Sequence, residues 1–348
     1  MPSGILSKIL CHLCVDGPLA LRHLLLVSKG FYYTVVNDES LWTTISFDTE
    51  FLDHFRGRSD KQANRFTHQC LRRSNSRPLC IRILCYGTPE NERIAGFLQV
   101  LNDPQYMGYQ RCISLILDSG GWFSQITRKI LALLPRELPS LQKLSLFHFF
   151  DPEDYPRFPN CPVLDTVEML AHRPPYSLYW GKNFDRVTTL SFGKFSIDDW
   201  SSYDTATLSL FPMVRDLTLF TNGAGVSEGD KVQVRVRFQF LKTLRVCGGI
   251  PLAWLEAPTL EELHIKANTL NHTSIAALHN NSGPRCRHLY AHLPEAVSSV
   301  EPHWAETFTM LVEKCTRLHT LHISKWMEEE CQKFIGRCDI VLHEMLDI

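Results

Sequence analysis

A short apolar pattern recurs along most of this chain and constrains the fold more than any other feature. The pattern is apolar-x-x-apolar-x-apolar, and its clearest copies are Leu141–Leu146 and Leu260–Ile265. Apolar residues at every second position are typical of a β-strand that turns one face into a core. Because one strand cannot bury such a face alone, the repetition predicts many strands stacked side by side in a solenoid.

The spacing of the copies indicates the kind of solenoid. The middle apolar residues are Leu115, Leu144, Val167, Leu190, Leu217, Leu244, Leu263, Leu289 and Leu321. Successive copies lie 19 to 32 residues apart, which brackets the ~20–29-residue period of leucine-rich repeats. A β-propeller fits less well, because each four-stranded blade needs about 40–45 residues.

The segments between the expected strands are irregular. Helical spacing predicts helices over 122–134 and 304–312, and the first strand of the solenoid is expected at 79–84. The C-terminal residues 325–348 alternate charged with apolar side chains, and we expect them to cap the last coil.

The first 47 residues carry a different pattern, that of three short helices and an anchor. A helical apolar stripe over 5–13 is followed by a break at Asp16–Pro18 and a second, largely apolar helix over 19–27. Ser28 is placed to cap a third helix, and Leu41 and Trp42 return as an anchor. So short a bundle cannot bury all its apolar residues, which favours a partner on this surface.

Three separated motifs in this segment carry a family resemblance. Pro2-x-x-Ile5-Leu6-x-x-Ile9-Leu10, Leu24-x-x-Val27-Ser28-Lys29 and Leu41-Trp42 occur in that order. Together they resemble the F-box, the module that docks a substrate receptor onto the Skp adaptor of cullin–RING ubiquitin ligases. The chain departs from the family where Met1 and Gly4 replace the usual Leu and Glu, and where Phe31 and Tyr32 stand in place of a common Trp.

The resemblance implies a set of adaptor-binding residues. They are Pro2, Ile5, Leu6, Ile9, Leu13, Leu25, Val27, Phe31, Leu41 and Trp42. It also implies a Skp-type adaptor as partner, a cullin scaffold reached through that adaptor, and an unknown protein substrate. The implied function is substrate recognition within the ligase. The alternative is a non-catalytic repeat scaffold whose F-box-like cap is degenerate.

The expected fold class is therefore α/β. A three-helix F-box at 1–47 precedes a helical linker at 48–78, whose basic run Arg72–Arg77 is interpreted as a solvated turn. An irregular leucine-rich-repeat solenoid with an inner parallel sheet follows at 79–324, and the cap at 325–348 completes the chain. The irregularity makes the solenoid similar to the repeats of fungal F-box proteins.

A repeat receptor of this kind would bind its substrate on the concave inner sheet. Side chains between the core positions point out of that sheet, and those of the C-terminal repeats are rich in His and basic residues. The candidate substrate-binding residues are Arg245, His264, Lys266, Tyr290 and His322. Their composition favours a somewhat acidic protein target.

Charge and cysteine content bear on partners and compartment. The chain has 36 Lys and Arg against 37 Asp and Glu, a net charge of −1, so no basic field for nucleic acid is expected. No apolar run reaches the ~18 residues of a membrane span, and the first residues do not form a signal peptide. Twelve irregularly spaced cysteines do not form a disulfide framework, which favours the cytoplasm or the nucleus.

Two motifs that could carry chemistry are incomplete. Cys11-His-Leu-Cys14 has the spacing of half a zinc site, but no second pair lies nearby in the sequence. Asn222–Gly229 is rich in glycine but lacks the Lys-Ser/Thr of a phosphate-binding loop. We therefore predict no catalytic residue, metal or cofactor, and no enzyme activity.

Overall fold

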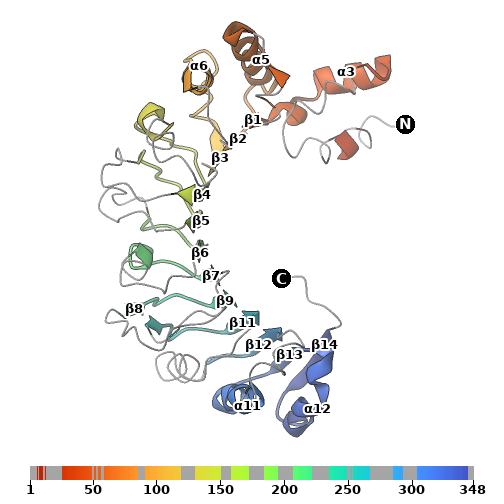
Figure 1. Cartoon of the computed structure of the whole chain (residues 1–348), viewed down its shortest axis with the longest axis vertical. Coiled ribbons are helices and arrows are strands. Elements are labelled where there is room, and N and C mark those ends of the chain that lie inside the picture. The colour runs from red at the N-terminus through yellow and green to blue at the C-terminus, as the bar shows by residue number, and fades with distance from the viewer. Residues whose placement is uncertain are drawn as a thin grey trace. The chain divides into compact units, whose positions relative to one another are not determined.

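The structure is a computed structural model (Figure 1). It describes residues 6, 8–10, 12, 26–48, 51, 54–55, 59–84, 91–118, 130–149, 158–171, 184–194, 207–221, 235–248, 252, 254–266, 285–292 and 304–343. The chain divides into two compact units close to Glu168. No helix in the described ranges is long and apolar enough to cross a membrane.

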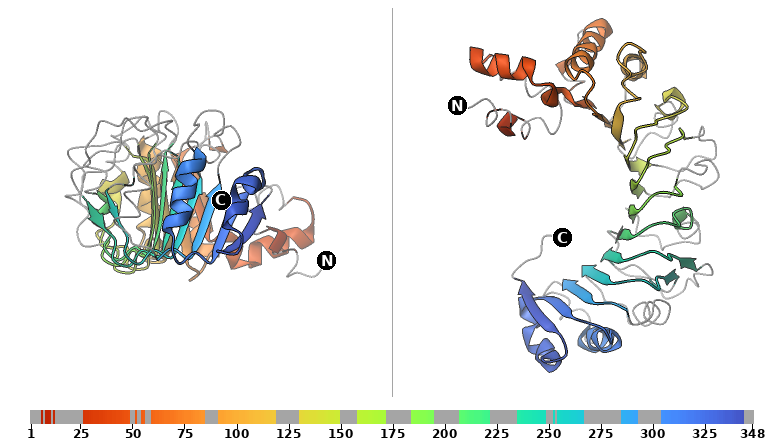
Figure 2. Two further views of the ribbon diagram at one scale, coloured as in Figure 1. Left: turned by 90° about the horizontal axis from the view of Figure 1, so that it is seen from below. Right: turned by 180° about the vertical axis from the view of Figure 1, so that it is seen from behind.

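The first unit contains helices followed by the first strands of a parallel sheet. Its elements are α3 (Lys29–Asn37), the 3-10 helix η2 (Glu39–Trp42), β1 (Thr44–Phe47), α5 (Asp60–Arg73), β2 (Leu79–Leu84), α6 (Asn91–Leu101), β3 (Cys112–Asp118) and β4 (Lys143–Phe149). The strand order is β1-β2-β3-β4, and neighbouring strands are parallel. Helices α5 and α6 lie side by side next to these strands (Figures 1 and 2).

Helix α3 begins where the sequence predicted a cap. The Ser28 hydroxyl accepts a hydrogen bond from the backbone N–H of Phe31, at 3.2 Å, which satisfies a donor that the first helical turn leaves free. Asp38 ends the helix and caps η2 through a hydrogen bond from the N–H of Ser40. A helix therefore lies at the place of the predicted third helix. Leu6, Ile9 and Leu10 of the first predicted helix are helical, and most of the second lies outside the described residues.

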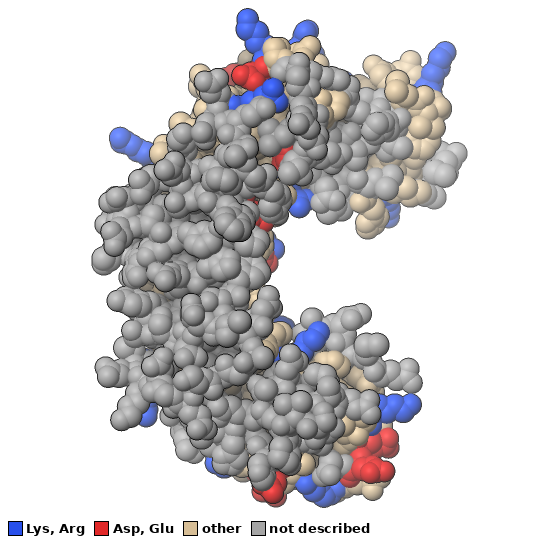
Figure 3. Space-filling model, in the orientation of Figure 1, with Lys and Arg blue, Asp and Glu red and all other residues tan. Residues whose placement is uncertain are grey.

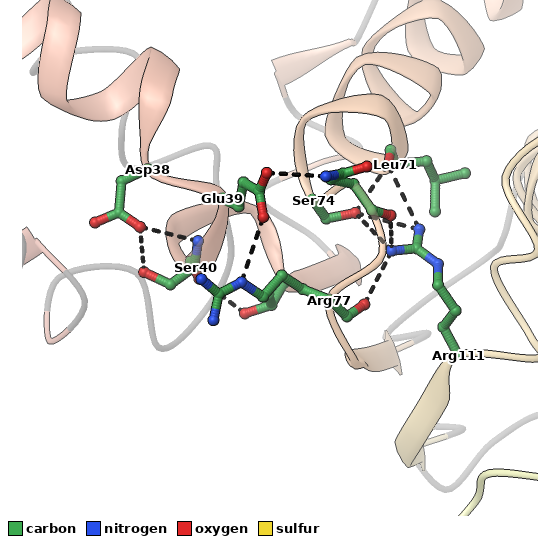
Figure 4. A network of polar contacts seen from close by, with 9 residues as sticks. Asp38, Glu39, Ser40, Leu71, Ser74, Arg77 and Arg111 are labelled. Carbon is green, nitrogen blue, oxygen red and sulfur yellow. Dashed lines mark hydrogen bonds and ion pairs between the residues drawn. The ribbon is translucent and has the colours of Figure 1, made fainter.

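The basic run at 72–77 does more than form a solvated turn. The guanidinium of Arg73 lies 4.4 Å from the ring centre of Trp42, and Arg77 pairs with Glu39 at 3.4 Å. Arg111, immediately before β3, donates hydrogen bonds to the carbonyl oxygens of Asn75 and Arg77 (Figure 4). These contacts hold η2, the end of α5 and β3 together within the first unit.

The second unit continues the repeat pattern. Its elements are β6 (Thr189–Lys194), β7 (Asp216–Thr221), β8 (Val236–Arg237), β9 (Thr243–Cys247), β10 (Leu255–Glu256), β11 (Glu262–Lys266), β12 (His288–His292), α11 (Trp304–Lys314), β13 (Thr320–Ser324), η4 (Lys325–Met327), α12 (Glu328–Cys331), η5 (Gln332–Phe334) and β14 (Asp339–His343). The strand order is β6-β7-β9-β11-β12-β13-β14, and β8 and β10 form a separate pair. Strand β5 (Thr166–Ala171) has residues in both units, and with it the described residues form twelve strands of the main sheet.

The predicted core positions lie in register across the strands. Leu217 of β7 pairs with Leu190 of β6 and with Leu244 of β9. The row continues through Leu263 and Leu289 to Leu321. All these leucines are at most 2% exposed, so they form one continuous apolar row within the second unit. The α/β repeat architecture with a parallel sheet is thus confirmed, as is the helix predicted at 304–312.

The sheet is longer at both ends than the sequence predicted. Strand β1 pairs with β2, Ile45 opposite Ile81, so the segment at 79–84 is the second strand and not the first. At the other end the expected cap contains a strand, β14, in which Ile340 pairs with Leu321. A four- or five-residue strand carries too little periodicity to be recognised without knowledge of its partner.

Candidate functional site

An exposed apolar surface lies at the start of α3 and the turn before it. Leu26 is 87% exposed, Val27 62% and Tyr33 62%. Tyr32 packs edge-on against Tyr33, with ring centres 5.8 Å apart. Apolar side chains exposed this close together in sequence mark an interaction surface more often than scattered single residues do. We call Leu26, Val27, Tyr32 and Tyr33 the apolar surface.

The anchor behind this surface is buried inside the chain itself. Leu41 and Trp42 are each 2% exposed, and the indole N–H of Trp42 donates to the carbonyl oxygen of Val35 at 2.7 Å. They therefore hold α3 in place and do not offer a free surface to a partner. Of the other predicted adaptor-binding residues, Leu6 is buried, Phe31 is half-buried, and Ile9 and Val27 are exposed. Pro2, Ile5, Leu13 and Leu25 lie outside the described residues.

A second candidate surface lies on the strands of the second unit. We call it the ladder face, and its central row is Arg245, His264, Tyr290 and His322, which are successive Cα partners on β9, β11, β12 and β13. Lys266 lies two residues after His264 on the same face of β11. All five residues predicted to bind a substrate therefore lie on one face, although 77 residues separate Arg245 from His322 in the sequence.

The rings of the central row are stacked. The ring centres of His264 and Tyr290 are 4.0 Å apart with planes 2° from parallel, and those of Tyr290 and His322 are 4.1 Å apart at 11°. His343 of β14 continues the stack at 5.2 Å from His322. Because β11 and β13 flank β12, both faces of the Tyr290 ring are covered.

Burial disfavours the charged form of three imidazoles on the ladder face, those of His264, His322 and His292. Burial lowers the pKa of His264, and the nearby Arg245 lowers it further. Burial likewise lowers the pKa of His322, with His343 as the next cause, and that of His292, with Lys266 as the next. Desolvation and a nearby cation both disfavour imidazolium, so these groups gain protons only below the ordinary His range.

Charge is distributed unevenly across the ladder face. One edge, at the first residues of the strands, carries Asp216, Glu262 and Asp339. The central row and the opposite edge carry Arg245, Lys266, His292 and His343. Arg245 and Lys266 form no ion pair with any described residue. The part of the face beyond the acidic edge is therefore cationic or protonatable.

The sequence did not identify His343 as a member of this site. It lies in the segment expected to cap the solenoid, and its apolar neighbours Ile340, Val341 and Leu342 were the only local signal of a strand. The Nδ1 atom of His322 lies 2.9 Å from Nε2 of His343. On the adjacent strands, the Ser324 hydroxyl lies 3.0 Å from Nδ1 of His292.

The other motifs add no site. Cys11, Cys14 and the segment 222–229 lie outside the described residues. Within the described part of the chain, no three His, Cys, Asp or Glu side chains are grouped to hold a metal ion. Basic and acidic side chains are interspersed over the described surface seen in Figure 3, and neither sign covers a broad area there.

Comparisons with known proteins yield structural neighbours only. No family model and no curated protein sequence matches the chain. The leucine-rich repeat-containing protein LegL7 of Legionella pneumophila is similar over 79% of this chain and 86% of its own, at 14% identity and a TM-score of 0.41. The TLR13–ssRNA13 complex is similar over 82% of this chain and 40% of that chain, at 12% identity and a TM-score of 0.40. Both scores are below 0.5, so the repeat architecture rests on this chain's own strand register.

Proposed function

We propose that this chain is a substrate-recognition subunit of a cullin–RING ubiquitin ligase. The N-terminal helices dock a Skp-type adaptor, and the ladder face binds a protein substrate. The chain supplies binding and no catalytic group. Its contribution to the reaction is to raise the effective concentration of a substrate lysine near the ubiquitin carrier that the other subunits hold.

The observation that carries the proposal is the apolar surface. Leu26 and Val27 immediately precede the cap residue Ser28 and expose most of their side chains, in the segment that resembles the F-box. Removing such side chains from water stabilises a complex by roughly 25 cal/mol per Å² of apolar area. The buried pair Leu41–Trp42 supports this docking indirectly, because it fixes the position of α3.

Adaptor binding by the full chain tests the proposal. Val27→Asp places a charge on the apolar surface, and we expect it to abolish co-purification with a Skp-type adaptor. Because Val27 is exposed, the folded state is retained, as circular dichroism would show. Leu6 is a poorer probe because it is only 8% exposed, so a charge there threatens folding.

Ile335→Asp is the matched control. Ile335 is 72% exposed and lies in the C-terminal cap, so the same kind of substitution leaves adaptor binding unchanged. Loss of binding in both variants, or in neither, would contradict docking through the apolar surface. Failure of the folded wild-type chain to bind the adaptor would favour the alternative, a repeat scaffold with a degenerate F-box-like cap.

A further inference from the structure

The stacking on the ladder face leaves the Tyr290 ring without a free face for a ligand. The Tyr290 ring is covered by His264 on one side and His322 on the other, at 4.0 and 4.1 Å. Bases of nucleic acid bind proteins mainly by stacking on free aromatic faces, and the Tyr290 ring offers none. Imidazole nitrogens and the Tyr290 hydroxyl are groups that can form hydrogen bonds to oxygen atoms.

The nitrogen of one imidazole lacks a partner. Nε2 of His264 is buried and makes no hydrogen bond with a described residue, and the nearest carboxylate oxygen, Oε2 of Glu262, is 3.6 Å away. That separation is too long for a hydrogen bond. Because its neighbours cover this nitrogen, a ligand on the ladder face would meet Arg245, the partner of His264 in the row, before it could reach the nitrogen.

We propose that the part of the ladder face formed by Arg245, Lys266, His264, His322 and His343 binds a carboxylate-rich peptide segment of a protein partner, and that the segment binds together with protons. The inference rests on the proposed function, in which this face binds a protein substrate. It adds the chemical class of the substrate segment that binds. Charge complementarity carries the assignment, because two cations without a described ion-pair partner lie among protonatable rings.

The acidic edge sets the position of the segment. Asp216, Glu262 and Asp339 repel carboxylates from the first residues of the strands and leave the central row and the Lys266 edge for them. The same edge disfavours a long, uniformly charged phosphodiester chain lying across the strands. A peptide can place its carboxylates singly opposite Arg245 and Lys266.

The groups around each imidazole fix the direction of the pH dependence. Arg245, Glu262, Tyr290 and His322 surround His264. His288, Tyr290 and His343 surround His322, and Lys266, Ser324 and His343 surround His292. Most of the groups around these three imidazoles are cations or neutral rings. A bound carboxylate adds the opposite charge and raises the imidazole pKa, so affinity increases as the pH falls.

Fluorescence anisotropy with a labelled peptide of Glu and Ser tests the inference on the full chain. A peptide with Gln in place of Glu serves as the neutral probe, and the ionic strength is fixed because salt screens such contacts. We expect binding of the Glu peptide to be about 10-fold tighter at about pH 5.5 than at about pH 7.5, on either side of the ordinary His pKa of ~6.5. The Gln peptide shows no such gain.

Substitutions on the ladder face test whether the peptide binds there or responds only to the overall charge of the protein. Arg245→Gln and Lys266→Gln should weaken binding about 10-fold at both pH values, as loss of one charge-assisted hydrogen bond implies. His322→Gln should reduce the difference between the two pH values. Arg317→Gln is the matched control, because Arg317 is exposed in the turn before β13, and it should change nothing.

Defined outcomes would overturn the inference. No binding of the Glu peptide by the folded chain at either pH would do so, as would equal losses in Arg317→Gln and Arg245→Gln. Tighter binding of a single-stranded RNA of equal charge would replace the peptide assignment by a nucleic-acid one. Val27→Asp should leave peptide binding intact, so failure of adaptor docking and failure of this inference are distinguishable.

Discussion

Nδ1 of His322 lies 2.9 Å from Nε2 of His343, which places the two imidazoles at the end of the ladder face in direct contact. Two facing ring nitrogens at this distance share a single hydrogen, because one must donate and the other accept. Full protonation of both rings would therefore break the contact and place two cations side by side. The pair makes the second unit sensitive to acid.

Acidification should destabilise the fold through this pair. Burial and His343 hold the pKa of His322 below its ordinary value of 6.5, whereas in the unfolded chain it titrates near ~6.5. A base whose pKa is lower in the folded state than in the unfolded state contributes to the free energy of unfolding above the unfolded-state pKa. That contribution is lost as the pH falls through the folded-state pKa. The Tm should therefore decrease below about pH 6.5.

The variant His343→Gln tests this coupling. Removing the second imidazole raises the pKa of His322, so the decrease in Tm with acid becomes smaller. The exposed His319 provides the control, because His319→Gln should leave the pH dependence of Tm unchanged. Equal acid sensitivity in the wild type and in His343→Gln would show that the pair is not responsible.

The guanidinium of Arg111 stabilises the junction after α5. It donates to the carbonyl oxygens of Asn75 and Arg77, the latter at 2.9 Å, and lies 3.3 Å from the Ser74 hydroxyl (Figure 4). Arg111→Met removes these donors, and because Asn75 and Arg77 are exposed, water can hydrate their carbonyls in its place. We expect the free energy of unfolding to fall by about 0.5–1.5 kcal/mol in urea titrations. Arg65→Gln on the exposed side of α5 should change it by at most about 0.5 kcal/mol.

Leu244 lies at the centre of the buried leucine row of the second unit. It is fully buried and pairs with Leu217 and Leu263. Leu244→Ala leaves a cavity between strands that cannot collapse independently, so we expect a loss of about 2–5 kcal/mol in the free energy of unfolding. Phe240→Ala, at a side chain that is 40% exposed, should have a much smaller effect. Similar losses in both variants would argue against a continuous core.

The ring of Phe220 occupies the space that a side chain at position 193 would need, so this position favours glycine. The two residues are Cα partners on β6 and β7, and a Cβ atom at position 193 would occupy the place of the Phe220 ring. Gly193→Ala should therefore destabilise the protein by about 1–3 kcal/mol, as overpacking does. In the double variant with Phe220→Ala, the two effects should not add, which a double-mutant cycle would measure.

Gly30 provides the contrast within α3. A Cβ atom there would meet only the Ser28 hydroxyl oxygen, at 3.7 Å. Gly30→Ala should stabilise the helix by roughly 0.5–1 kcal/mol, because Gly loses more backbone freedom on folding than Ala does. A loss of stability at this position would contradict the described geometry of α3.

The sequence by itself determined those elements that are specified by residues close to one another in the chain. Period-two alternation around Leu217, Leu244 and Leu263 located strands and core positions, because a pleated strand sends every second side chain to one face. Ser28 identified the start of α3 for a similar reason, since its hydroxyl caps a backbone donor only three residues away. The candidate ladder residues could also be selected, as the positions between the core residues.

Only the tertiary structure decided which of these positions meet. Strand register places His264, Tyr290 and His322 in one stack and brings His343 to its end, and register depends on pairing between segments that are distant in sequence. The same holds for β1 and β14, whose short patterns become strands only beside β2 and β13. Burial likewise separated the exposed Val27 from the buried Trp42, because packing and not residue type decides which apolar side chains reach solvent.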